Sequence, residues 1–167
     1  MGSYLSLPIL VLAAILQATL IPQIRIEGGG PDLVFLLVLA WAIKSSLDEA
    51  VVWAFVGGIA QDSMSAAPLG TSILGMIVIV FVVNIIGRQI YNVSLPLIAI
   101  FTLFGSIFQQ TVIVIIIIIA GFEVRLTDNF SYVIVPTIIY NLVLIWPVYW
   151  LVRRIQRRVH ARRRIFT

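Results

Sequence analysis

Long apolar runs separated by short polar stretches dominate the pattern of this sequence. The runs fall at residues 5–21, 33–43, 50–60, 71–86, 95–120 and 132–152. In lipid, every backbone amide must be paired within its own segment or within a closed barrel, so runs of this length without polar alternation predict helices. We therefore expect an all-α integral membrane bundle of six transmembrane helices.

The second and third apolar runs fall well short of the roughly 20 residues that a membrane span needs. They can cross only if their polar ends, at residues 31–32, 44–49 and 61–63, lie at the interfaces or inside the protein. A re-entrant pair of helices is the other possibility.

Composition supports lipid as the natural solvent of this chain. The 167 residues are 61% hydrophobic and 11% charged, and the mean hydropathy is +1.12. A soluble domain of this size could not cover so much apolar surface. We expect one transmembrane domain over residues 1–152 and a basic cytoplasmic tail over residues 153–167. The first run lacks a basic flank and a small-residue cleavage site, so we interpret it as a retained span.

The distribution of basic residues predicts the orientation. With six spans, Lys44, Arg88 and the seven arginines of residues 153–164 share one side, whereas Arg25 and Arg125 lie on the other. The positive-inside rule then places both termini in the cytoplasm. This result holds even if the second and third helices form a re-entrant pair, because the four remaining spans are still an even number and leave both termini on one side.

The inventory of reactive residues argues against an enzyme. The chain has no cysteine, and its one histidine, His160, lies in the basic tail. No nucleophile elbow, phosphate-binding loop or dinucleotide fingerprint occurs. We expect no cofactor, no metal and no nucleic acid as a ligand. No charged residue lies in the middle of a span, which also disfavours ion-coupled transport.

Asp32 follows Pro31 at the predicted start of the second helix. Proline is well tolerated at the first helical position, and a carboxylate there faces the positive end of the helix dipole. A capping role alone would explain this acid.

Asp62 lies at the outer end of the third helix, where the dipole disfavours an anion. Ala54 and Gly58 precede it at four-residue spacing, which places the acid on a small-residue packing face. We expect the carboxylate either to cap the following turn, through the amides of residues 63–65, or to pair with Arg25 or Arg125. Further on, Pro68 and Gly70 predict a defined external turn.

Amide side chains fall near mid-membrane in the last two helices. Gln109 or Gln110 and Asn141 are expected to form a polar network, either as a hydrogen bond that stabilises the bundle or as the lining of a small-molecule cavity. In the tail, Arg153, Arg154, Arg157 and Arg158 are expected to contact anionic lipid or a cytoplasmic partner.

Residues 28–70 resemble the bacterial rod-shape-determining MreD family. The resemblance is carried by PDLVFLLVLAWA and, further on, AFVGGIAQDSMSAAPLGTSIL. The matching motif residues are Pro31, Asp32, Gly57, Gly58, Asp62, Pro68 and Gly70. One departure is Gln61, which with Ile59 and Ala60 stands where a Gly-Leu-like pair would be expected.

The resemblance implies a non-enzymatic component of the cell-elongation machinery in the bacterial cytoplasmic membrane. Members of this family associate with MreC, a bitopic protein, and with the actin-like MreB and the SEDS glycosyltransferase and transpeptidase of peptidoglycan synthesis. Their fold is similar to that of the substrate-binding subunits of energy-coupling-factor vitamin transporters, which implies six helices around an outward-facing cavity.

Two functions follow as hypotheses. The first is a scaffold that maintains cell shape by binding MreC through small-residue faces, with a second copy of itself as a further candidate partner. Its candidate contacts, which are equally good candidates for internal packing, are Ala54, Gly58, Asp62, Thr71 and Gly75. The alternative is a substrate-binding subunit of a vitamin-type transporter, with Asp32, Asp62, Gln109 and Asn141 around its cavity.

Overall fold

The computed structural model describes residues 2–24, 28–65, 68–89, 94–122 and 130–163. Within these residues, the all-α prediction is confirmed, with six α-helices and one π-helical turn. They are α1 (Gly2–Ile24), α2 (Leu33–Ala42), α3 (Leu47–Ser63), α4 (Thr71–Gln89), α5 (Leu95–Ile119), η1 (Phe130–Ile134) and α7 (Val135–Arg163).

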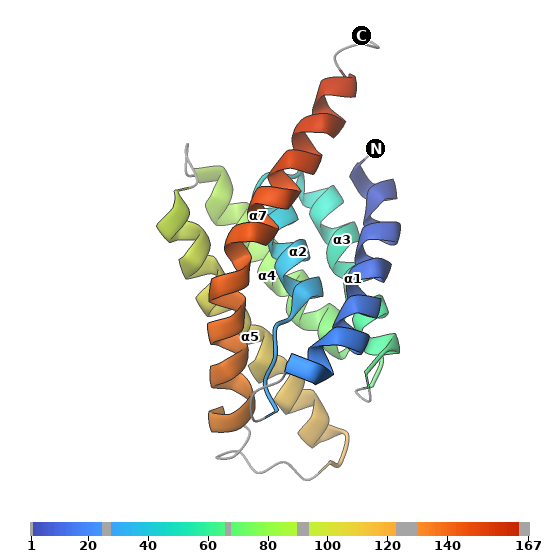
Figure 1. The fold of residues 1–167 in the computed structure, drawn as a ribbon, viewed down its shortest axis with the longest axis vertical. Coiled ribbons are helices and arrows are strands. Elements are labelled where there is room, and N and C mark those ends of the chain that lie inside the picture. Colours follow the sequence, from blue (N-terminus) through green and yellow to red (C-terminus); the bar gives the residue numbers. More distant parts are fainter. Residues whose placement is uncertain (1, 25–27, 66–67, 90–93, 123–129, 164–167) are drawn as a thin grey trace.

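Successive helices run in alternate directions, so the start of α1 and the end of α7 lie at the same end of the bundle (Figure 1). The turn between α2 and α3 lies at that end too. Three helical stretches are long and apolar enough to cross a membrane, at Ser6–Ile24, Leu95–Ile119 and Tyr132–Arg157. Shorter apolar helices cover Leu33–Ala42 and Thr71–Gly87. The expected basic tail continues α7 as a helix as far as Arg163.

The shortest helix, α2, is the core of the fold. Every residue of α2 after Leu33 is buried, and α2 contacts α1, α3, α4 and α7. Its Trp41 ring stacks on Trp53 of α3, with centroids 4.0 Å apart and planes 10° apart. Because α2 is apolar on all sides, it is stable only when other helices surround it.

A non-helical segment, residues 28–32, extends α2 toward the opposite end of the bundle (Figure 1). A ten-residue helix is about 15 Å long, half of a hydrocarbon core of about 30 Å. The segment packs closely on η1 and on the start of α7, because a Cβ atom on Gly29 would lie 2.6 Å from the carbonyl oxygen of Val133 and 2.8 Å from Cβ of Pro136. Together the segment and α2 account for an apolar run that is too short to span as a helix alone.

Candidate functional site

Five polar side chains meet where α2 begins, and we call them the α2 polar cluster. They come from α1, from the segment before α2, and from α3, α5 and α7: Gln17, Asp32, Gln61, Ser106 and Asn141. Asp32, Ser106 and Asn141 are buried, at 4%, 1% and 1% exposure. Side-chain hydrogen bonds thus join α1, α3 and α7 to the start of α2, and α5 is joined through Asn141.

Asp32 is the N-cap of α2, as the sequence suggested. Its Oδ1 atom accepts a hydrogen bond of 3.1 Å from the backbone N–H of Phe35. Its Oδ2 atom accepts from Nε2 of Gln61, at 3.0 Å. The carboxylate therefore caps one helix and holds a second one against it.

Asn141 and Gln17 bind two further amides at the same helix start. The N–H of Asp32 donates to Oδ1 of Asn141 at 2.9 Å, and the N–H of Val34 donates to Oε1 of Gln17 at 3.1 Å. Asn141 also donates through Nδ2 to Oγ of Ser106, at 3.0 Å. A helix that starts inside a membrane protein has no bulk water for its first amides, so side chains from neighbouring helices satisfy them.

A cavity of about 150 Å³ lies beside this cluster. Its lining includes Gln17, Asp32, Gln61, Gln110 and Thr137. The Oε1 atom of Gln61 is buried and has no hydrogen-bond partner among the described residues. With about 30 Å³ per water molecule, the cavity has room for a few waters bound to these polar groups.

Asp62 caps the start of α4. Its Oδ2 atom accepts from the N–H of Gly70 at 2.8 Å, and its Oδ1 atom accepts from the N–H of Ser72 at 3.1 Å. The carboxylate thus binds amides eight and ten residues ahead, beyond the turn expected at residues 63–65. Arg25 and Arg125, the other expected partners, lie outside the described residues. The positive end of the α4 dipole explains why an acid is accommodated at the end of α3.

Residues 68–70, just before α4, have the backbone that Pro68 and Gly70 predict. The Pro68 carbonyl oxygen accepts from the hydroxyl of Thr71 at 2.6 Å. Gly70 has a φ angle of +100°, which favours glycine over residues with a side chain. The turn therefore delivers the first amides of α4 to Asp62.

The small-residue face proposed for partner binding lies inside the fold. Ala54, Gly58, Thr71 and Gly75 are all buried. A Cβ atom on Gly58 would lie 2.7 Å from Cα of Ile73, so α3 and α4 are in backbone contact there. Gly57, one residue earlier, faces α2. These residues serve internal packing, the alternative that the sequence left open.

Gln109, Gln110 and Asn141, which were expected to form one polar network, lie at separate points of the bundle. Gln109 donates through Nε2 to the carbonyl oxygen of Ser72 at 3.3 Å, and its side chain packs directly on Gly75. It therefore joins α5 to α4, whereas Asn141 joins α7 to α2 and α5. Gln110 lines the cavity beside the α2 polar cluster.

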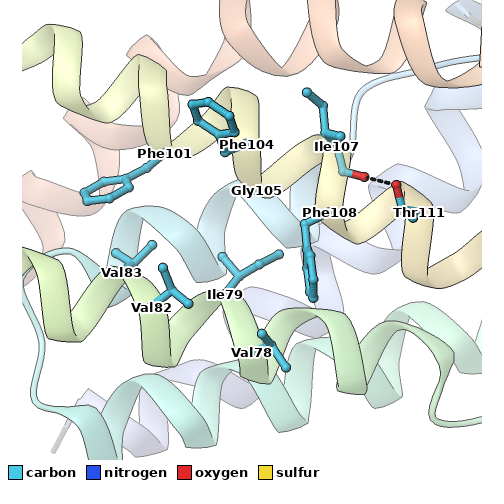
Figure 2. A pocket seen from close by; sticks show the side chains of 10 residues that line it. All are labelled: Val78, Ile79, Val82, Val83, Phe101, Phe104, Gly105, Ile107, Phe108 and Thr111. Carbon is cyan, nitrogen blue, oxygen red and sulfur yellow. Dashed lines mark hydrogen bonds between the residues drawn. The ribbon is translucent and has the colours of Figure 1, made fainter.

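An apolar groove of about 410 Å³ lies between α4 and α5 and opens on the outside of the bundle (Figure 2). Val78 and Val82 of α4 and Phe104 and Phe108 of α5 line it, and these four are 40–65% exposed. The one hydroxyl in the lining, that of Thr111, donates to the carbonyl oxygen of Ile107 at 2.7 Å. The groove thus offers a wholly apolar surface. The ten lining residues are Val78, Ile79, Val82, Val83, Phe101, Phe104, Gly105, Ile107, Phe108 and Thr111.

Basic residues gather at the end of the bundle where α1 starts and α7 ends. Lys44, Arg153 and Arg157 line one cavity there. Arg154 lies over the ring of Trp150, with its Cζ atom 5.4 Å from the centroid. The side chain of Arg158 lies outside the described part of the chain.

The comparison with protein families decides the identity. The family model of rod shape-determining protein MreD matches residues 1–159. The chain belongs to the MreD family. Membership implies a role in determining rod shape and makes this a non-enzymatic membrane protein. Comparisons with curated proteins and with solved structures gave no match.

Several residues of this MreD-family site were not singled out from the sequence. Ser106 gave no signal, because a lone hydroxyl in an apolar helix usually bonds its own backbone. Gln61 was noted only as a departure from the family pattern, although it binds Asp32. Gln17 is a polar residue within the apolar run of the first span, and that position was the available signal.

Proposed function

We propose that this protein is a membrane scaffold of the rod complex and binds the single transmembrane helix of an MreC-like protein. The observation that carries the proposal is the groove between α4 and α5. It is open, apolar and lined by three phenylalanines, and it lies on the outside of a bundle whose small-residue face is already used internally.

A partner helix suits this groove better than a polar segment would. Its lining offers no free hydrogen-bonding group, so a helix with its backbone amides already paired can enter without leaving polar groups unsatisfied. Large apolar side chains of the partner would fill the space between Phe104 and Val78. Close packing, and not the hydrophobic effect, drives such association in lipid.

The residues required by the transporter alternative are engaged within the fold. Asp62 caps α4, Gln109 binds the carbonyl of Ser72, and Asn141 binds Ser106 and the start of α2. Asp32 does line a cavity, but its volume of about 150 Å³ is below the roughly 300–1,000 Å³ of small-molecule sites. The geometry therefore favours the scaffold over a vitamin-binding subunit.

Photo-crosslinking in membranes tests the proposal. A benzoyl-phenylalanine is placed at Phe104 or Val78 in cells that produce a tagged MreC-like partner. The matched control is Leu12 of α1, which is 58% exposed on a different helix. The scaffold predicts a crosslink to the partner from positions 78 and 104 and none from position 12.

Other outcomes would contradict this assignment. Crosslinks from Leu12 alone would indicate that the partner binds at α1 and not in the groove. A product of twice the mass of this chain would favour a homodimer across the groove. If the crosslink to the partner forms, the MreB-like actin and the SEDS glycosyltransferase and transpeptidase would be expected in the same assembly.

A further inference from the structure

The cavity at the shared end of α1 and α7 is built from segments far apart in the sequence. It measures about 250 Å³ and is lined by Lys44, from the turn between α2 and α3, and by Arg153, Gln156 and Arg157 of α7. The three basic side chains reach the surface, although Lys44 is also partly buried. Folding therefore concentrates three positive charges around one opening.

These charges have no acidic partner in the described part of the chain. No carboxylate there forms an ion pair with Lys44, Arg153 or Arg157. Burial lowers the pKa of Lys44 below its usual value, and the positive charges of Arg153 and Arg157 lower it further. Like charges held together in this way favour binding of an anion, which removes the repulsion.

Gln156 holds the arginines of α7 close to Lys44. It is 7% exposed, and its Nε2 atom donates to the carbonyl oxygen of Trp41 at 3.3 Å. This bond ties α7 to the last turn of α2, next to the turn that carries Lys44. Arg153 and Arg157, which lie on either side of Gln156 in α7, are thereby held near Lys44.

The basic cavity continues toward an apolar surface. Arg153 and Arg157 also line a second cavity of about 290 Å³, together with Trp150 and Arg154. Trp150 is 61% exposed, and the neighbouring Leu151 is 48% exposed. Exposed tryptophan beside arginine is typical of the level at which a membrane protein meets lipid headgroups.

We infer that Lys44, Arg153 and Arg157 bind the phosphate of an anionic phospholipid, whose acyl chains lie along the surface beside Trp150. Arginine presents two N–H groups that match phosphate oxygens, and lysine adds a point charge. Basic pockets between transmembrane helices on the cytoplasmic side bind headgroups in this way. The inference is independent of the groove between α4 and α5.

Native mass spectrometry of the purified full chain tests the site. The probes are phosphatidylglycerol, phosphatidylcholine with the same acyl chains, and soluble glycerol phosphate. We expect Lys44→Gln and Arg157→Gln each to weaken phosphatidylglycerol binding about fivefold, the effect of one basic residue near a membrane surface. The matched control is Arg154→Gln, which removes the same charge from the same helix but does not line the Lys44 cavity.

Three results would overturn the inference. Equal losses in Lys44→Gln and Arg154→Gln would mean diffuse attraction without a site. Equal binding of phosphatidylglycerol and phosphatidylcholine would mean that the anionic headgroup is not recognised. Glycerol phosphate binding as tightly as the lipid would assign the cavity to a free phosphate. Crosslinking from Phe104 in Lys44→Gln reports separately on the partner groove.

Discussion

The backbone N–H of Asp32 donates to Oδ1 of Asn141, 109 residues further along the chain, across 2.9 Å. This bond joins the start of the central helix to the last helix. Asn141 reaches on to Ser106 of α5, so one amide side chain connects three elements. The start of the central helix is therefore held in part by a residue that lies far from the family motif around Asp32.

Replacing Asn141 by alanine removes both hydrogen bonds and leaves a buried N–H without a partner. We expect the unfolding free energy to fall by about 1–3 kcal/mol, as for other buried groups left unsatisfied. Unfolding in mixed detergent, followed by circular dichroism, measures the change. Ser106→Ala, which removes only the second bond, should cost less. Equal costs for the two variants would mean that the bond to Asp32 contributes nothing.

Replacing Asp62 by alanine removes the cap of α4. The expected loss is about 0.5–2 kcal/mol, the usual contribution of a side chain that binds the first amides of a helix. Asp62→Asn keeps one acceptor oxygen and should lose less. The same detergent unfolding applies, with Asp48→Asn as the control because Asp48 is an exposed acid on the same helix. If Asp48→Asn destabilises as much as Asp62→Ala, the cap is not the cause.

Replacing Gly58 by alanine forces α3 and α4 apart, because the new Cβ atom would lie 2.7–2.8 Å from backbone atoms of Ile73. We expect a loss of about 1–3 kcal/mol, typical of overpacking. The control is Gly87→Ala in α4, where the nearest atom is 3.7 Å away. That variant should be neutral or more stable, since alanine favours helix over glycine. If Gly58→Ala and Gly87→Ala change the melting temperature by the same amount, α3 and α4 are not closely packed at Gly58.

Lys44 predicts a pH dependence in the absence of anionic lipid. Its pKa is lowered in the folded protein, chiefly by burial and then by Arg153 and Arg157. The unfolded chain therefore binds more protons than the folded one as pH rises toward 10.5, and stability should increase over that range. The difference in melting temperature between the native chain and Lys44→Gln, measured from pH 7 to pH 10, isolates this contribution. Arg154→Gln should keep the native pH slope.

The predictions from sequence were most accurate where the interaction is local. The cap of α2 by Asp32 spans three residues, and helix-start rules describe it directly. The cap of α4 by Asp62 spans eight to ten residues and crosses a turn, so the sequence indicated the residue but not its partners. The bond between Asn141 and Asp32 joins residues 109 apart, and the cavity shared by Lys44 and Arg153 joins equally distant parts of the chain, so no local pattern predicts either.

The sequence by itself determined that the chain is helical, lies in a membrane, lacks an enzyme's residues and resembles one family. Hydropathy and residue inventory settle the first three points, because each depends on local composition, whereas the resemblance rests on the motif residues around Asp32 and Asp62. Only the tertiary structure decided that α2 is a central half-length helix, that the small-residue face packs internally and that an apolar groove and a basic cavity remain outside. Those outcomes depend on which helix surfaces meet. Local sequence patterns allow several pairings of helices, and close packing between distant segments determines which pairing forms.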